Sequence, residues 1–79
     1  MPVSAEFTIY PFIEGDALPP HVQAGIEAVR ALGIDVEIGA LSNTVRGEAE
    51  DVLRALHAAE GAAVAAGATR IVAIVETVE

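Results

Sequence analysis

The segment Val3-Ser4-Ala5-Glu6-Phe7-Thr8-Ile9-Tyr10 alternates between apolar and polar side chains along its whole length. Successive side chains of a β-strand point to opposite faces, so this pattern predicts a strand that is buried on one face only. The side chains expected to be buried are those of Val3, Ala5, Phe7 and Ile9, and those expected on the other face are those of Ser4, Glu6, Thr8 and Tyr10. Pro11 follows and ends the strand, because proline has no backbone N–H to donate.

The rest of the chain predicts further helices and strands, and together with this strand they give the order β-α-β-β-α-β. Helical spacing of apolar residues identifies the helices, while alternation and glycine punctuation identify the strands and turns. The expected elements are a loop over residues 12–20, which contains Gly15 and Asp16, a helix over 21–32, strands over 35–38 and 41–46 joined at Gly39-Ala40, a helix from Gly47 to about Ala66, and a strand over 70–76.

The second predicted helix carries an apolar stripe at i, i+3, i+4, i+7 spacing. The stripe consists of Ala49, Val52, Leu53, Leu56, Ala59, Ala63 and Val64. Gly61 interrupts the same helix, where glycine costs about 1 kcal/mol relative to alanine. We therefore expect Gly61 to mark close packing against Gly25 of the first helix.

This order of elements predicts one α+β domain over residues 1–79 with the ferredoxin-like plan, in which two helices cover one face of a four-stranded antiparallel sheet. The other face is left bare. It would carry Tyr10 and one side of the last strand, which is apolar on both sides. Because a large apolar surface is unfavourable in water, we expect this face to pack against a second copy of the chain.

Composition excludes several classes of function. The net charge is −8, and no cluster of Lys and Arg is present, so we expect neither nucleic-acid binding nor attachment to an anionic membrane. No apolar run approaches the roughly 18 residues that span a bilayer. The absence of cysteine removes thiol catalysis and thiolate metal sites, and it favours a cytoplasmic protein.

Three segments in the right order resemble the signatures of the thiamine-binding YkoF-like family. They are Glu6-Phe7-Thr8-Ile9-Tyr10-Pro11 followed by Gly15, Gly39-Ala40-Leu41-Ser42-Asn43-Thr44-Val45-Arg46-Gly47-Glu48, and Gly67-Ala68-Thr69-Arg70-Ile71-Val72. The resemblance covers nearly the whole chain. It implies a ferredoxin-like fold, assembly of dimers or tetramers through the sheet, and binding of thiamine or its hydroxymethylpyrimidine moiety without catalysis. The chain departs from the family pattern at Asn43 and Arg46, where Thr and Glu are expected.

Two rows of polar side chains form the candidate ligand site. Glu6, Thr8 and Tyr10 share one strand face, with about 6.5–7 Å between successive side chains. A similar row on the neighbouring strand consists of Ser42, Thr44 and Arg46. Such groups suit an aminopyrimidine and a cationic thiazolium, because carboxylates, hydroxyls and an aromatic face recognise them. The alternative is that both rows only face solvent or satisfy one another at a subunit interface.

Asn43 has the opposite parity to Ser42 and Thr44 in a regular strand. Its side chain would then point inward among apolar residues, where it needs a hydrogen-bond partner. An irregular strand start would instead let it reach the site, so we count it as a possible contact.

No metal site and no catalytic motif is expected. His21 and His57 lie in different predicted helices and lack HxxxH-type spacing, so we expect His21 to be exposed in a first turn and His57 to flank the second helix. The serines lack a nucleophile-elbow motif. Three functions therefore compete. They are a non-enzymatic thiamine-binding module without a cofactor, a structural or regulatory oligomer without a ligand, and a small enzyme that would need a buried base such as Glu6.

Overall fold

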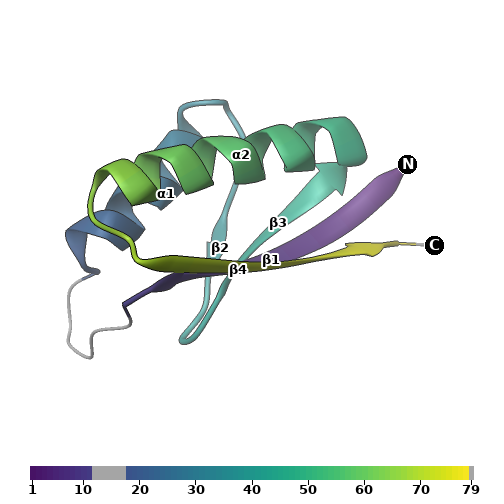
Figure 1. Cartoon of the computed structure of the whole chain (residues 1–79). Coiled ribbons are helices and arrows are strands. Elements are labelled where there is room, and N and C mark those ends of the chain that lie inside the picture. The colour runs from purple at the N-terminus through teal and green to yellow at the C-terminus, as the bar shows by residue number, and fades with distance from the viewer. Residues whose placement is uncertain (12–17, 79) are drawn as a thin grey trace.

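The computed structural model describes residues 1–11 and 18–78, so that most of the predicted loop over 12–20, including Gly15 and Asp16, lies outside the described residues. The described elements follow the predicted order (Figure 1). They are β1 (Pro2–Tyr10), α1 (Pro20–Arg30), β2 (Glu37–Ile38), β3 (Asn43–Glu48), α2 (Ala49–Ala65) and β4 (Arg70–Thr77).

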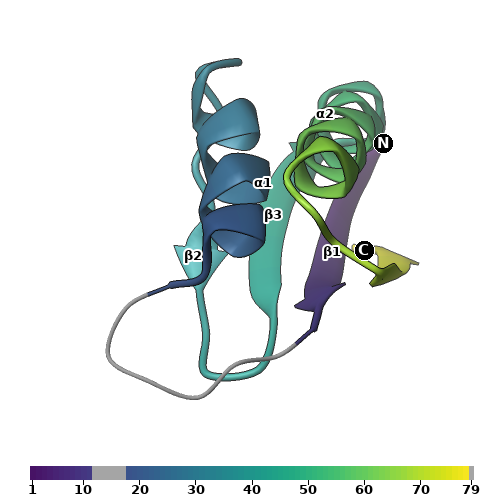
Figure 2. The ribbon, with the colours of Figure 1, turned by 60° about the vertical axis from the view of Figure 1, so that its left-hand side comes forward.

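The strands form one sheet in the order β2-β3-β1-β4, and every neighbouring pair is antiparallel. Both helices lie on the same side of this sheet, as the view in Figure 2 shows. This arrangement confirms the ferredoxin-like α+β fold that the sequence predicts. We call the side of the sheet away from the helices the open face.

β1 lies in the middle of the sheet, and its alternation is confirmed residue by residue. Val3, Ala5, Phe7 and Ile9 are buried on the helix side. They form a single core with Val29 of α1, Val45 of β3 and the buried side of α2. Burying a side chain of the size of valine, isoleucine or phenylalanine stabilises the fold by about 1.5–3 kcal/mol. The polar residues of β1 are thereby directed to the open face.

The boundary between β3 and α2 differs from the prediction. Gly47 does not open the helix but pairs with Val3 in the sheet, and Glu48 pairs with Pro2. The ladder continues to the helix itself, because the Ala49 N–H donates to the Met1 carbonyl oxygen at 2.8 Å. Pairing with the long central strand therefore outweighs the local signal of glycine as a helix start.

The predicted apolar stripe of α2 is partly wrong. Leu53 and Val64 are 54% and 61% exposed, whereas Ala55, which the stripe omitted, is fully buried. The buried residues of α2 are Val52, Ala55, Leu56, Ala59 and Ala63. Small side chains dominate this set because α2 packs closely on both α1 and the sheet, so the helix needs only a narrow buried stripe.

Gly25 and Gly61 do not face each other. A Cβ atom at Gly25 would lie 2.7 Å from Ile9 Cδ1 and 3.5 Å from the Ala59 carbonyl oxygen, whereas a Cβ atom at Gly61 would meet nothing within 4 Å. Gly25 is thus the point of close packing between α1, β1 and α2. The expected role of Gly61 is wrong, and its helix position is open to solvent.

We expect opposite effects from alanine at these two glycines. Gly61→Ala should raise the free energy of unfolding by about 0.5–1 kcal/mol, because it removes backbone entropy from an exposed helix position. Gly25→Ala should lower it by about 1–3 kcal/mol, because the new methyl group overpacks a buried contact. Urea unfolding at one fixed protein concentration measures both, and a loss of stability in Gly61→Ala would contradict this packing.

Candidate functional site

The open face carries the polar row of β1 between two rows from its neighbours. Across β1–β3, Glu6 pairs with Thr44, and Ser4 pairs with Arg46. Across β1–β4, Glu6 pairs with Ile74, and Thr8 pairs with Val72. Since directly opposed residues share a face, the two predicted polar rows lie side by side, and an apolar row from β4 borders them.

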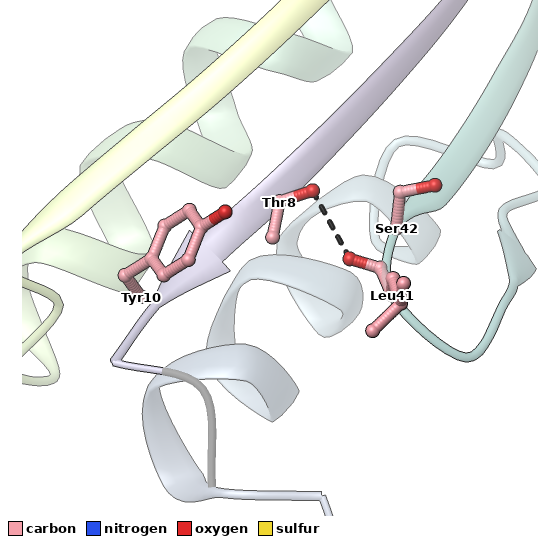
Figure 3. A pocket seen from close by; sticks show the side chains of 4 residues that line it. All are labelled: Thr8, Tyr10, Leu41 and Ser42. Carbon is pink, nitrogen blue, oxygen red and sulfur yellow. Dashed lines mark hydrogen bonds between the residues drawn. The ribbon is translucent and has the colours of Figure 1, made fainter.

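A pocket of about 310 Å³ opens at the end of these rows, where β1 ends and the β2–β3 hairpin turns. It is lined by Thr8, Tyr10, Leu41 and Ser42 (Figure 3). Three of these residues were predicted as ligand contacts from the sequence. Leu41 was not, since it gave no polar signal; only its place beside Ser42 in the predicted hairpin could have indicated it.

Two hydrogen bonds fix the hairpin at the pocket, one to β1 and one within the turn. The Thr8 hydroxyl donates to the Leu41 carbonyl oxygen at 3.1 Å, as Figure 3 shows. The Gly39 N–H donates to the Ser42 carbonyl oxygen at 2.9 Å and closes the turn. A Cβ atom at Gly39 would lie only 2.7 Å from that same oxygen. The turn therefore needs glycine, and it sets the position of Leu41 and Ser42.

Tyr10 forms the aromatic wall of the pocket. Arg70, which opposes it across β1–β4, places its guanidinium carbon 5.0 Å from the centre of the Tyr10 ring. This is a cation–π distance, and it restrains the ring at one side.

The remaining predicted contacts lie at different distances from the pocket. Glu6 and Thr44 are next along the open face, and Glu6 is exposed. The enzyme alternative requires a buried base such as Glu6, and the exposed Glu6 of this chain does not meet that requirement. Arg46 lies further along β3, where its guanidinium donates to the Glu37 carboxylate at 2.8 Å.

Asn43 points to the opposite side of the sheet from the pocket. Its side chain is buried, and its amide nitrogen donates to the Phe7 carbonyl oxygen at 3.4 Å. Of the two orientations considered for Asn43, inward or toward the site, the protein therefore adopts the inward one, with a hydrogen-bond partner. Asn43 lies directly opposite Phe7 in the ladder, so it ties β3 to β1 beneath the pocket.

His21 is not exposed, contrary to expectation. It lies in the first turn of α1 but is only 7% exposed, and its Nε2 lies 2.7 Å from the Pro11 carbonyl oxygen. This contact with the end of β1 draws the ring inward. Across residues 1–11 and 18–78, no three His, Cys, Asp or Glu side chains cluster where they could hold a metal ion. Over the same ranges, no helix has the length and apolar character that crossing a bilayer requires.

The chain is similar to one family of proteins and to proteins of known structure. Residues 5–77 match the family model described as thiamine-binding protein. No curated protein matches the chain. A domain of unknown function from Bacillus cereus is 28% identical, with a TM-score of 0.71, and the match covers 95% of this chain and 72% of that one.

A second solved structure has the same fold at lower identity. It comes from Thermotoga maritima and is provisionally described as a thiamine biosynthesis and salvage protein. It is 22% identical with a TM-score of 0.67, and the match covers 96% of this chain and 81% of that one.

The turn at Gly39 gives a direct test of how the pocket is built. Gly39→Ala should lower the free energy of unfolding by about 1–3 kcal/mol, because the added methyl group overlaps the Ser42 carbonyl oxygen. Leu41→Ala is the matched control in the same turn, and we expect it to change stability by less than about 0.5 kcal/mol because Leu41 is exposed. Urea unfolding compares the two, and equal stabilities would show that the turn does not depend on glycine.

Proposed function

The chain belongs to the thiamine-binding protein family, and from that premise we propose that it binds thiamine, or the hydroxymethylpyrimidine part of thiamine, without catalysing a reaction. The proposed site is the pocket of Thr8, Tyr10, Leu41 and Ser42, extended along the open face by Glu6 and Thr44. The observation that carries the proposal is that three of the four residues lining this pocket were predicted as ligand contacts from the sequence. All four lie within residues 5–77, the range that matches the family model.

The size and lining of the pocket support a single heteroaromatic ring as its occupant. About 310 Å³ is at the lower end of the range of roughly 300–1,000 Å³ that small-molecule sites span. The ring would stack on Tyr10, and the hydroxyls of Thr8 and Ser42 would meet its nitrogen and amino groups. The Thr8 hydroxyl donates to the Leu41 carbonyl oxygen, so its own oxygen is available to accept from an amino group.

Charge supports the placement of the cationic thiazolium along the open face toward Glu6. Glu6 follows Thr8 on the same face of β1, at about 6.5–7 Å for residues two apart in a strand. The net charge of −8 also favours a cationic ligand over a phosphorylated one at long range. Arg46 lies at the rim of this site, with its charge held by Glu37.

We also propose that a second copy of the chain covers the open face and completes the site. Val72 and Ile74 are 36% and 53% exposed there, beside the polar row of β1. Burying these side chains against a second sheet would remove apolar surface from water, and the polar row would remain as a niche between the two sheets.

Glu6→Gln distinguishes the two parts of the proposed ligand. The variant should weaken thiamine binding about twofold to fivefold, because an exposed carboxylate contributes up to about 1 kcal/mol toward a nearby cation. Binding of neutral hydroxymethylpyrimidine should change by less than twofold. Isothermal titration calorimetry with both compounds measures these effects.

Glu60→Gln is the matched control, because Glu60 is an exposed carboxylate on α2, on the other side of the sheet. It removes the same charge and should leave both affinities unchanged. Equal losses of thiamine affinity in the two variants would mean that only net charge matters and would remove Glu6 from the site. Absence of binding by the unmodified protein to either compound would favour a structural or regulatory oligomer.

A further inference from the structure

The Arg70 side chain contacts Tyr10 from the flank of β1 that lies away from the pocket. Arg70 is the first residue of β4 and pairs with Tyr10 across β1–β4, and its guanidinium carbon lies 5.0 Å from the centre of the Tyr10 ring. Leu41 and Ser42, which line the pocket together with Tyr10, belong to the hairpin on the β3 flank. Tyr10 therefore separates a cation on one side from the pocket on the other, and Figure 3 shows it between β4 and the hairpin.

The backbone holds Arg70 and Tyr10 next to each other. The Thr69 N–H donates to the Tyr10 carbonyl oxygen at 2.9 Å, directly before Arg70 enters the sheet. From there the β1–β4 ladder runs without a break to the pair of Val3 and Thr77. The side chains of Arg70 and Tyr10 thus leave directly opposed backbone positions on the same face, and strand pairing rather than a loop brings them into contact.

Arg70 brings a positive charge to the Tyr10 end of the open face. Within residues 1–11 and 18–78, no carboxylate lies at ion-pair distance from its guanidinium, whereas the other arginine of the sheet, Arg46, pairs with the Glu37 carboxylate at 2.8 Å. Glu6 lies on the same face of β1 as Tyr10, four residues and about 13 Å away along the strand. The open face is therefore positive at the Tyr10 end and negative at Glu6.

A cation on one face of an aromatic ring changes what the opposite face can bind. The faces of the ring carry the negative part of its quadrupole, which is what attracts the guanidinium. A second cation stacked on the pocket side of Tyr10 at about 3.5–4 Å would lie roughly 9 Å from the guanidinium carbon, within the Debye length of about 10 Å at 0.1 M salt. The two cations would repel each other, whereas a neutral ring in the same place keeps the stacking contact without this penalty.

We propose that Arg70 is a specificity-determining residue of the ligand site, which makes the Tyr10 wall selective for an uncharged aminopyrimidine ring over a cationic ring. This inference rests on the proposed function and adds to it a residue that does not line the pocket. The ligand then binds in one direction only. Its pyrimidine ring stacks on Tyr10, and its thiazolium lies away from Arg70, toward Glu6. A compound whose cationic ring has to stack on Tyr10 binds more weakly.

Arg70→Gln tests this selectivity by isothermal titration calorimetry with thiamine and with neutral hydroxymethylpyrimidine. We expect the ratio of the thiamine to the hydroxymethylpyrimidine association constant to rise about twofold to fivefold, the range that one exposed charge interaction supports. Arg70→Lys keeps the positive charge and should leave the ratio within about 1.5-fold of that of the unmodified protein. In 1 M salt, where the Debye length is about 3 Å, the effect of Arg70→Gln on the ratio should disappear.

Arg54→Gln is the matched control for charge. Arg54 is an exposed arginine of α2, on the helix side of the sheet, so its replacement changes the net charge equally and should leave the ratio unchanged. An unchanged ratio in Arg70→Gln, or an equal rise in both variants, would overturn the role of Arg70 while leaving ligand binding itself intact. Failure of the unmodified protein to bind either compound would instead contradict the proposed function, and the selectivity with it.

The direction of the bound ligand gives a second test, which does not depend on affinity. Tyr10 is the only tyrosine of the chain, so its ring protons are assigned directly in nuclear magnetic resonance spectra. In the unmodified protein saturated with thiamine, we expect nuclear Overhauser effects between the Tyr10 ring and the pyrimidine protons, and none to the thiazolium protons. In Arg70→Gln, effects to the thiazolium protons should appear as well. Effects between Tyr10 and the thiazolium in the unmodified protein would overturn the proposal.

Discussion

The hydrogen bonding of β1 on both of its sides is the constraint from which the other features follow. Its residues pair with β3 on one side and with β4 on the other in one register, so the strand cannot slip by one residue without exposing Phe7 and burying Glu6. The apolar side is committed to the core beneath α2. The polar side is thereby held on the open face in a fixed register with both neighbours.

The candidate site is a consequence of where this central strand ends. Thr8 and Tyr10 are the last residues of the polar row, and the β2–β3 hairpin brings Leu41 and Ser42 against them (Figure 3). Asn43 strengthens the junction from the core side through the Phe7 carbonyl oxygen. The pocket is thus built from rigid strand ends and one tight turn, which suits a binding site that needs preformed geometry.

The sequence indicates most of this arrangement, because period-two alternation in β1 and glycine punctuation are local signals. Prediction from the sequence fails where contacts between residues far apart in the chain determine the structure. Gly47 resembles a helix start, yet the ladder with Val3 keeps it in the sheet. Leu53 and Val64 fit a helical stripe, yet both are exposed, because α2 buries a narrower stripe that includes Ala55 instead. His21 is held inward by its contact with the Pro11 carbonyl oxygen. The spacing of residues along the sequence does not predict a contact of this kind.

The most direct test of the proposed function is a nuclear magnetic resonance titration of the ¹⁵N-labelled protein with thiamine. We expect saturable chemical-shift changes in the backbone amides of Thr8, Tyr10, Leu41 and Ser42, with smaller changes in Glu6 and Thr44. Amides of α1 and of the outer side of α2 should remain unshifted. Changes confined to the helices, or no saturable change anywhere, would contradict a thiamine site on the open face.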